Sequence, residues 1–167
     1  MSSTLGCEIR WLIRRDMNEV MAIEQASFQD PWTEDEFLQV LRQRNCIGIV
    51  AELDRVIHGY AIYELNEHDF NFLNFAVAES SRRSGVGRAL IQRMKDKLSQ
   101  QGRRELVASV RETNLEGQLF LQAMGFRAEA VLRDYYGEEF GFEDAYSMRY
   151  EIDGSERFIP KNRLKWV

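Results

Sequence analysis

The sequence predicts an α/β fold, with a mixed central sheet of about seven strands and helices on both of its faces. Short apolar runs, several of them alternating with polar residues, predict the strands. Amphipathic stretches with apolar residues three or four positions apart predict the helices. Some predicted strands are joined by tight turns and others by helices, so the sheet contains antiparallel and parallel neighbours. The predicted order is β-α-α-β-β-β-α-β-α-β-β.

The N-terminal segment is predicted to hold one strand followed by two helices. Apolar side chains occupy alternate positions within residues 7–14, which is the period of a strand. Asp16, with Glu19 three residues later, has the spacing of a helix N-cap and its partner. After an interruption, Thr33 and Glu36 repeat that spacing and predict the start of a second helix.

Three consecutive apolar runs predict the middle of the sheet. They cover residues Cys46–Leu53, Val56–Leu65 and 70–77. Only Asp54 and Arg55 separate the first two runs, so these strands are expected to form a hairpin.

The second half of the chain alternates between helix and strand. Leu90, Met94 and Leu98 recur at intervals of four residues and predict one apolar helix face that stops near Gly102. The remaining predicted elements are a strand at 106–110, a helix capped by Asn114 and ended by Gly125, and two strands at 127–136 and 142–152.

The composition fits one globular domain. The chain has 167 residues, of which 44% are hydrophobic and 29% charged, and a domain of this size can bury a core without covalent cross-links. Its 22 Lys and Arg against 27 Asp and Glu give a net charge of −5, which argues against a protein that coats nucleic acid. Cys7 and Cys46 form no disulfide framework and no metal-ligand spacing. We expect no metal site, no membrane span, no secretory signal and a cytoplasmic location.

A glycine-bearing loop between a strand and a helix is the most informative segment. Arg82, Gly85 and Gly87 have the spacing R-x-x-G-x-G, and Arg83 and Arg88 add charge at the same place. Glycines let the backbone approach a ligand closely, and the free amides at a helix N-terminus attract phosphate. A tight turn with solvated arginines is the alternative. The position of the spacing between this strand and this helix favours a bound pyrophosphate.

This loop resembles the acetyl-CoA loop of the GCN5-related N-acetyltransferases (GNAT), and the predicted element order is similar to that fold. More narrowly, residues 8–152 resemble the RimI group, the ribosomal-protein-alanine N-acetyltransferases. Four segments carry the resemblance: residues 28–33 with Phe37, residues 75–87, residues 110–114, and residues 133–136 with 143–145.

The resemblance implies a binding site for acetyl-CoA. It assigns the pantetheine arm and the thioester to the backbone of Phe75, Ala76 and Val77. It assigns the pyrophosphate to the loop and the helix start, namely Arg82, Arg83, Ser84, Gly85, Val86, Gly87 and Arg88. Asn114 lies where the family uses an Asn to bind the cofactor arm; a plain helix N-cap is its alternative role.

The resemblance also implies a cleft for an acceptor peptide. Pro31 and Trp32 correspond to one wall of that cleft. A packed anchor for the turn, which is common for Trp, is the alternative. Tyr135 and Tyr136 correspond to its rim. Adjacent strand residues point to opposite faces, so one of these two tyrosines can instead belong to the core.

The acid and base of the family are replaced in this chain. The family's usual base, a Glu on the fifth strand, aligns with Ser109, and its usual acid, a Tyr on the next helix, aligns with Leu121. Ser109 can hold a water but is not a base, and Leu121 has no proton to give. Three accounts stay open. Other residues take over these roles, with Tyr135, Tyr136, Glu112 and Glu143 as candidates; proximity alone drives the reaction; or the protein binds acyl-CoA without transferring the acyl group.

The resemblance implies transfer of an acetyl group from acetyl-CoA to the N-terminal amine of a protein, expected to be a ribosomal protein beginning with alanine. A lysine or a small-molecule amine is the alternative acceptor. We expect residues 1–152 to form the N-acetyltransferase domain and residues 153–167 to form a basic tail, either a solvated or packed terminus or a ribosome contact. We expect a monomer or a weak homo-oligomer without direct nucleic-acid or membrane binding.

The charges are expected to be separated along the cleft. The arginines of the glycine loop lie where an anionic cofactor is expected. Glu138, Glu139, Glu143 and Asp144 lie beside the expected peptide cleft, where they favour a cationic N-terminus.

Overall fold

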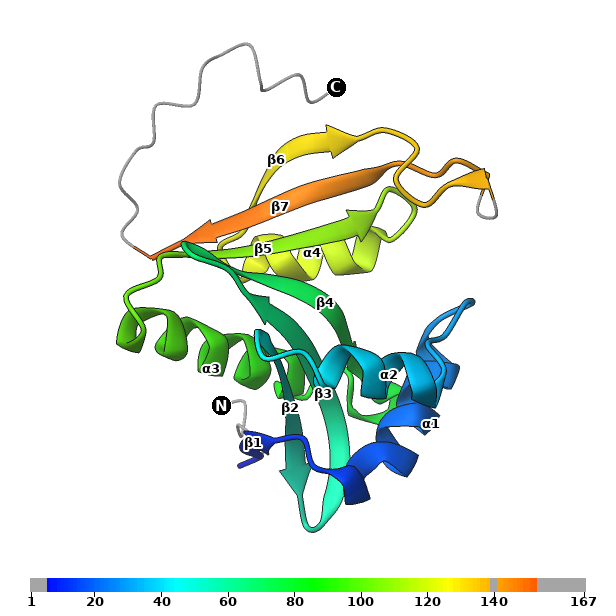
Figure 1. Cartoon of the computed structure of the whole chain (residues 1–167), viewed down its shortest axis with the longest axis vertical. Helices are drawn as coiled ribbons and strands as arrows, with labels where there is room; N and C mark the ends of the chain where they lie inside the picture. Colours follow the sequence, from blue (N-terminus) through cyan, green and yellow to red (C-terminus); the bar gives the residue numbers. More distant parts are fainter. Residues whose placement is uncertain (1–5, 139–140, 153–167) are drawn as a thin grey trace.

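The computed structural model describes residues 6–138 and 141–152 and contains one seven-stranded sheet, in the order β1-β2-β3-β4-β5-β7-β6 (Figure 1). Its strands are β1 (Glu8–Trp11), β2 (Cys46–Leu53), β3 (Val56–Leu65), β4 (Asp69–Val77), β5 (Glu105–Arg111), β6 (Arg127–Leu132) and β7 (Ala145–Glu151). All neighbours are antiparallel except β4 and β5, which are parallel. The predicted mixed sheet and its element order are confirmed. The basic tail predicted for 153–167 lies outside the described residues.

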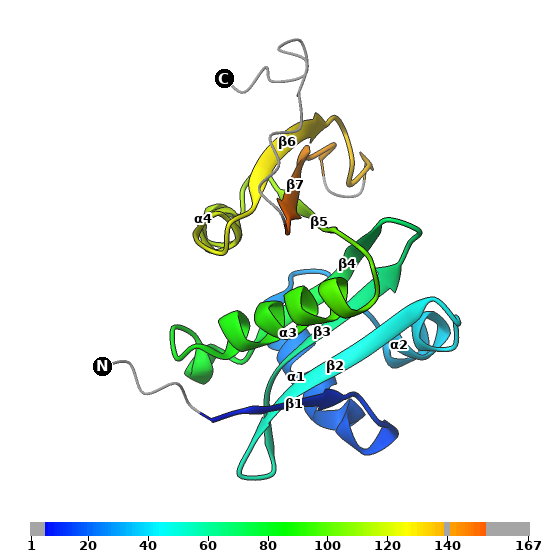
Figure 2. The same cartoon turned by 90° about the vertical axis from the view of Figure 1, so that its left-hand side faces the viewer.

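In the part of the chain that the structure describes, four helices pack on this sheet, and short 3-10 turns occupy Arg14–Asp16 and Glu79–Ser81. The helices are α1 (Met17–Ser27), α2 (Glu34–Leu41), α3 (Val86–Gln100) and α4 (Leu115–Ala123). In Figure 2, α3 and α4 lie on one side of the sheet and α1 and α2 on the other. The strands that α1 and α2 mainly contact are β2, β3 and β4, whereas α4 mainly contacts β6. One face of the β5–β7–β6 half therefore has no α1 or α2 above it.

Alternation along the central strands creates two separate cores, one on each face. On β3, Tyr60 and Ile62 pack with α1 and α2, whereas Ala61 and Tyr63 pack with α3 and α4. Successive side chains of a strand point to opposite faces, so a strand covered on both faces is apolar throughout. This explains why the runs that form β2 and β3 are almost continuously hydrophobic.

The hairpin between β2 and β3 has the bounds predicted from the sequence. Asp54 and Arg55 form its turn with φ of 52° and 64°, the paired left-handed conformation that matches the twist of two antiparallel strands. Asp residues tolerate this conformation better than most. The two-residue separation of the apolar runs therefore predicted the hairpin, whereas the register shift between Ala51 and Glu52 was not predicted.

The two predicted helix caps have different outcomes. The Thr33 hydroxyl accepts from the Glu36 N–H at 3.2 Å, and the Glu36 carboxylate accepts from the Thr33 N–H at 2.7 Å, which confirms the capping box. Asp16 makes no side-chain bond to α1. Its carboxylate instead accepts from Arg10 and from the Ile13 N–H, two residues that precede Asp16 in the sequence. Asp16 is thus the N-cap residue of α1, as predicted, but its side chain does not cap the helix because an arginine on β1 binds the carboxylate.

The last two strands are shorter than predicted. β6 ends at Leu132 and β7 begins at Ala145, so the segment between them is a loop. Asp134, Gly137, Gly141 and Phe142 have positive φ there, which breaks the strand pattern. Tyr135 and Tyr136 accordingly lie on a loop and not on a strand.

No helix in the described part of the chain has the length and apolar character needed to cross a membrane.

Candidate active site

The parallel strands β4 and β5 pair over only part of their length. Their register covers three positions, ending at Asn71 with Val107. Beyond that point β4 stays paired with β3 and β5 with β7, and the two strands diverge in Figure 1. Residues 72–77 of β4 therefore have no strand partner on the β5 side, and we call this the open edge of β4.

Backbone groups of Phe75 and Val77 face the open edge. The Ala78 N–H donates to the His58 carbonyl at 2.8 Å, which places alternate residues, Ala76 among them, toward β3. Phe75 and Val77 must then point away from β3. The guanidinium of Arg82 donates to the Val77 carbonyl at 3.2 Å, from the side of the open edge.

The glycine loop turns the end of β4 into the start of α3. Gly85 is the N-cap of α3 at φ 93°, and no side chain in the described part of the chain caps this helix. Its first amides are therefore available to an anion. A Cβ on Gly87 would lie 3.0 Å from Phe120, and the Phe120 ring stacks on Phe75. These residues fit a pyrophosphate, since glycines leave the backbone at the start of α3 without side chains. The Phe120 side chain of α4 packs beside this backbone.

Asn114 caps α4 by accepting from the Gly117 N–H at 2.9 Å. A Cβ on Gly117 would lie 2.6 Å from the Asn114 amide nitrogen, so a glycine at this position leaves room for the capping side chain. The predicted N-cap role is confirmed. Binding of the cofactor arm by Asn114 remains a prediction.

The positions of the family's acid and base lie in different environments. Ser109 pairs with Ser147 across β5 and β7, on the face opposite the core residues Ala108 and Val110. Leu121 is 8% exposed and belongs to the core beneath α4. Position 109 can therefore contact a water or a substrate, whereas position 121 serves packing.

Tyr136 is the half-buried member of the tyrosine pair. The Arg111 guanidinium lies 4.3 Å from the centre of the Tyr136 ring, and the Tyr135 ring packs edge-on against it at 5.0 Å. Tyr135 is 53% exposed. Burial raises the pKa of Tyr136 above its ordinary value, against the nearby charge of Arg111. The Tyr136 phenol is therefore protonated at neutral pH and can donate a hydrogen bond.

Glu143 is held in a hydrogen-bond network beside the tyrosine pair. Its carboxylate accepts from the Thr113 N–H and hydroxyl and from Arg111 at 3.1 Å. Hydrogen bonds from Thr113, together with the charge of Arg111, hold the pKa of Glu143 below its ordinary value. This geometry favours a structural role for Glu143. Glu112 is exposed, and its backbone N–H donates to the Asp144 carbonyl.

The acidic residues expected beside the cleft are partly neutralised. Asp144 pairs with Arg133 at 2.9 Å and accepts from the Asp134 N–H. Glu138 is exposed, and Glu139 lies outside the described residues.

The loop from α1 to α2 carries Pro31 and Trp32. The Trp32 ring packs edge-on against Phe37, with centroids 5.1 Å apart, so the predicted packing role of this Trp is confirmed. The Trp32 N–H donates to the Glu24 carboxylate at 2.8 Å. Its role as a wall of a peptide cleft remains a prediction.

The sequence interpretation missed a buried polar cluster that consists of Glu24, Tyr60 and Asn74. All three side chains are buried, on α1, β3 and β4. The Asn74 amide and the Tyr60 hydroxyl both donate to Glu24. One signal was available, because Glu24 follows Val20 and Ile23 on the apolar stripe of α1, where a carboxylate is unusual.

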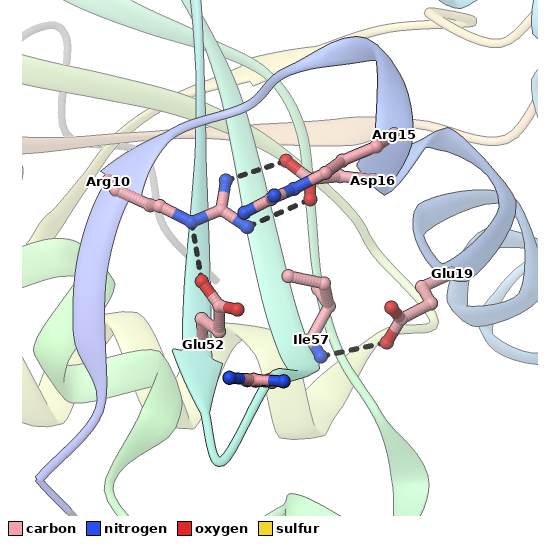
Figure 3. Close-up of a pocket in the computed structure, with 7 residues that line it drawn as sticks. Arg10, Arg15, Asp16, Glu19, Glu52 and Ile57 are labelled. Carbon is pink, nitrogen blue, oxygen red and sulfur yellow. Dashed lines mark hydrogen bonds and ion pairs between the residues drawn. The ribbon is translucent and has the colours of Figure 1, made fainter.

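A cavity of about 470 Å³ lies away from these residues, between β1, the start of α1 and the β2–β3 hairpin. Figure 3 shows Arg10 between Asp16 and Glu52, and Glu19 accepting from the Ile57 N–H. The ion pairs of Arg10 with Asp16 and Glu52 measure 2.7 and 2.6 Å. These bonds join β1, α1 and the hairpin. The acidic and basic groups that line the cavity balance, so it has no charge suited to an anionic cofactor.

The described residues contain no group of three or more side chains that could hold a metal ion. His68 is exposed, and its ring lies 3.7 Å from the Glu67 carboxylate. The His58 ring lies 2.7 Å from the Ser81 hydroxyl, which ties β3 to the turn before the glycine loop.

Comparisons with known proteins identify the family. The family model described as acetyltransferase (GNAT) matches residues 17–126. The [ribosomal protein bS18]-alanine N-acetyltransferase of Escherichia coli is 28% identical over 137 residues, covering 82% of this chain and 92% of that protein. The crystal structure of the ribosomal-protein-S18-alanine N-acetyltransferase from Escherichia coli matches with a TM-score of 0.78 and 26% identity, covering 92% of this chain and 99% of that one. Ard1 from Thermoplasma volcanium matches with a TM-score of 0.79 and 26% identity, covering 88% and 98%. The chain belongs to the acetyltransferase (GNAT) family.

Proposed function

We propose that this protein transfers an acetyl group from acetyl-CoA to the N-terminal α-amine of a ribosomal protein that begins with alanine. The observation that carries the proposal is the open edge of β4, which leads directly into the uncapped N-terminus of α3. The similar proteins from Escherichia coli are named for the alanine acetylation of a ribosomal protein. We further propose a cytoplasmic reaction, since ribosomal proteins are made there.

The donor site follows the chain from β4 into α3. Acetyl-CoA supplies the activated acetyl group when bound. The backbone groups of Phe75 and Val77 at the open edge are suited to the pantetheine arm, whereas Ala76 faces β3. The amides that follow Gly85 are suited to the pyrophosphate. Arg82, Arg83, Ser84, Val86, Gly87 and Arg88 complete this loop.

The acceptor site is proposed on the other side of the open edge. The loop with Pro31 and Trp32 forms one wall, and Tyr135 and Tyr136 form the opposite rim. Tyr136 is fixed by Arg111, while the exposed Tyr135 can adapt to different residues after the N-terminus.

The chemistry needs little help from a base. An N-terminal amine has a pKa near 8, so about a tenth of it is already neutral at pH 7. Ser109 can hold the water that accepts the proton that the amine nitrogen loses as its bond to the acetyl carbon forms. The protonated phenol of Tyr136 can donate to a reacting oxygen or sulfur. Holding the amine against the donor supplies most of the acceleration.

Two measurements on the purified protein test the proposal. Calorimetry with acetyl-CoA is expected to give one binding site. Release of CoA thiol is then followed with peptides that begin with Ala, Ser or Met and with a panel of lysine-containing and small-molecule amines. Turnover of the Ala peptide above all others supports the proposal. Turnover of the lysine or small amines alone overturns the proposed acceptor, and binding without turnover indicates an acyl-CoA-binding protein.

A further inference from the structure

Glu24 joins the loop that carries Trp32 to the strand that carries the donor site. Its Oε1 accepts from the Trp32 N–H at 2.8 Å. Its Oε2 accepts from the Asn74 amide at 2.9 Å and from the Tyr60 hydroxyl. One carboxylate group therefore divides its two oxygens between the loop on one side and strands β3 and β4 on the other.

This carboxylate is buried, and no cation among the described residues contacts it. Glu24 is 1% exposed, Tyr60 0% and Asn74 8%. Among the described residues, all the hydrogen-bond donors to Glu24 are neutral. Burial of a charge costs free energy that neutral donors offset only in part. An apolar residue at this position would fill the core at lower cost, so the carboxylate is explained by what its two oxygens connect.

Asn74, which Glu24 binds, lies on β4 next to the proposed donor site. The register of β3 with β4 shifts between Ile62 and Tyr63, which pair with Asn74 and Phe72, so Leu73 is an extra residue on β4. Asn74 directly follows this bulge and directly precedes Phe75, the first proposed donor residue. On the loop side, the Trp32 ring packs on Phe37, which in turn packs on Tyr60. The acceptor wall and the donor strand thus share one buried anchor.

We propose that Glu24 is a positioning residue that holds the Pro31–Trp32 loop at a fixed distance from the open edge of β4, so that an acceptor amine meets the acetyl donor. This inference rests on the proposed function. A shift of the Pro31–Trp32 loop would weaken binding of the acceptor. The glycine loop, which is proposed to bind the donor pyrophosphate, would stay unchanged because β4, α3 and α4 hold it.

Three variants test the inference through separate constants for the two substrates. Glu24→Leu removes both connections, and we expect the peptide KM to rise at least tenfold while the acetyl-CoA Kd stays within twofold. Glu24→Gln keeps an acceptor for the Trp32 N–H, and the Asn74 amide can turn to match it, so the peptide KM should stay within threefold. Val20→Ala is the matched control, since Val20 lies one turn earlier on the same buried face and makes no bond to the loop. It should lower the Tm but leave both constants within twofold.

The outcomes separate this inference from the proposed function. If Glu24→Leu and Val20→Ala give the same peptide KM, the positioning role is overturned while the proposed function stands. If the wild-type protein turns over no α-amine peptide, both are overturned. Should Glu24→Leu fail to fold, Asn74→Ala takes its place, because it cuts the connection to β4 and leaves the Trp32 hydrogen bond intact. A peptide KM raised at least threefold supports the inference, and an unchanged one overturns it.

Discussion

Replacement of Gly85 by alanine should damage acetyl-CoA binding far more than it damages the fold. Gly85 has φ 93°, and a Cβ built there meets no atom within 4 Å. The stability cost is therefore conformational, roughly 1–2 kcal/mol for a left-handed L-residue, offset by about 0.4–1 kcal/mol from the lower entropy of the unfolded chain. A net loss of about 1 kcal/mol lowers the Tm by roughly 2–4 °C in a chain of this size.

The effect on binding follows from where that methyl group points. It occupies open space at the N-cap of α3, and the pyrophosphate is proposed to lie at the first amides of that helix. Loss of one charge-assisted hydrogen bond costs about 1.5–3 kcal/mol, which corresponds to a rise in Kd of roughly ten- to a hundredfold. Calorimetry with acetyl-CoA measures this change directly.

The chain offers a matched control at the other end of the same helix. Gly102 also has positive φ, at 68°, and a Cβ there also meets no atom within 4 Å. Gly102→Ala should therefore lower the Tm by a similar amount and leave the acetyl-CoA Kd unchanged. An equal Kd for the two variants would refute the placement of the pyrophosphate at Gly85.

Three further predictions concern protons. Tyr136→Phe should lower kcat at least tenfold at nearly constant Tm; a change below twofold would remove Tyr136 as the proton donor. The kcat/KM for an α-amine peptide should rise about tenfold per pH unit and level off near pH 8, since Ser109 is not a base and Glu143 is held by Thr113 and Arg111; a plateau from pH 6 would indicate an enzyme base. Burial, with the hydrogen bond to Glu24, raises the pKa of Tyr60, so the folded state keeps a proton that the unfolded chain loses above about pH 10, and stability falls as pH rises there. Denaturant titrations of Tyr60→Phe should show a fall shallower by about 1.4 kcal/mol per pH unit, and identical slopes would contradict this account.

Local signals predicted the parts of the fold that depend on neighbours in the chain. The hairpin turn at Asp54 and Arg55 and the capping box of Thr33 with Glu36 are set within a few residues, and the structure confirms both. The glycine loop is likewise local, because Gly85 must be left-handed where β4 turns into α3. A sequence pattern carries such information directly.

Contacts between distant residues decided what the sequence did not predict. Glu24 lies 50 residues from Asn74 and 36 from Tyr60, so no local pattern indicates that these side chains meet. Thr113 and Arg111 lie 30 and 32 residues from Glu143, and their hydrogen bonds, that of Thr113 first, hold the pKa of Glu143 below its ordinary value, which its sequence neighbours do not suggest. Asp16 differs from its prediction for the same reason, because Arg10 on the edge strand binds its carboxylate.

The site of acetylation on a peptide tests the central claim most directly. A peptide that begins with alanine and contains one internal lysine is incubated with the protein and acetyl-CoA, and tandem mass spectrometry locates the added group. The proposed function predicts one acetyl group, on the α-amine of the alanine, and none without the protein. An acetyl group on the lysine alone, or an unmodified peptide, would contradict it.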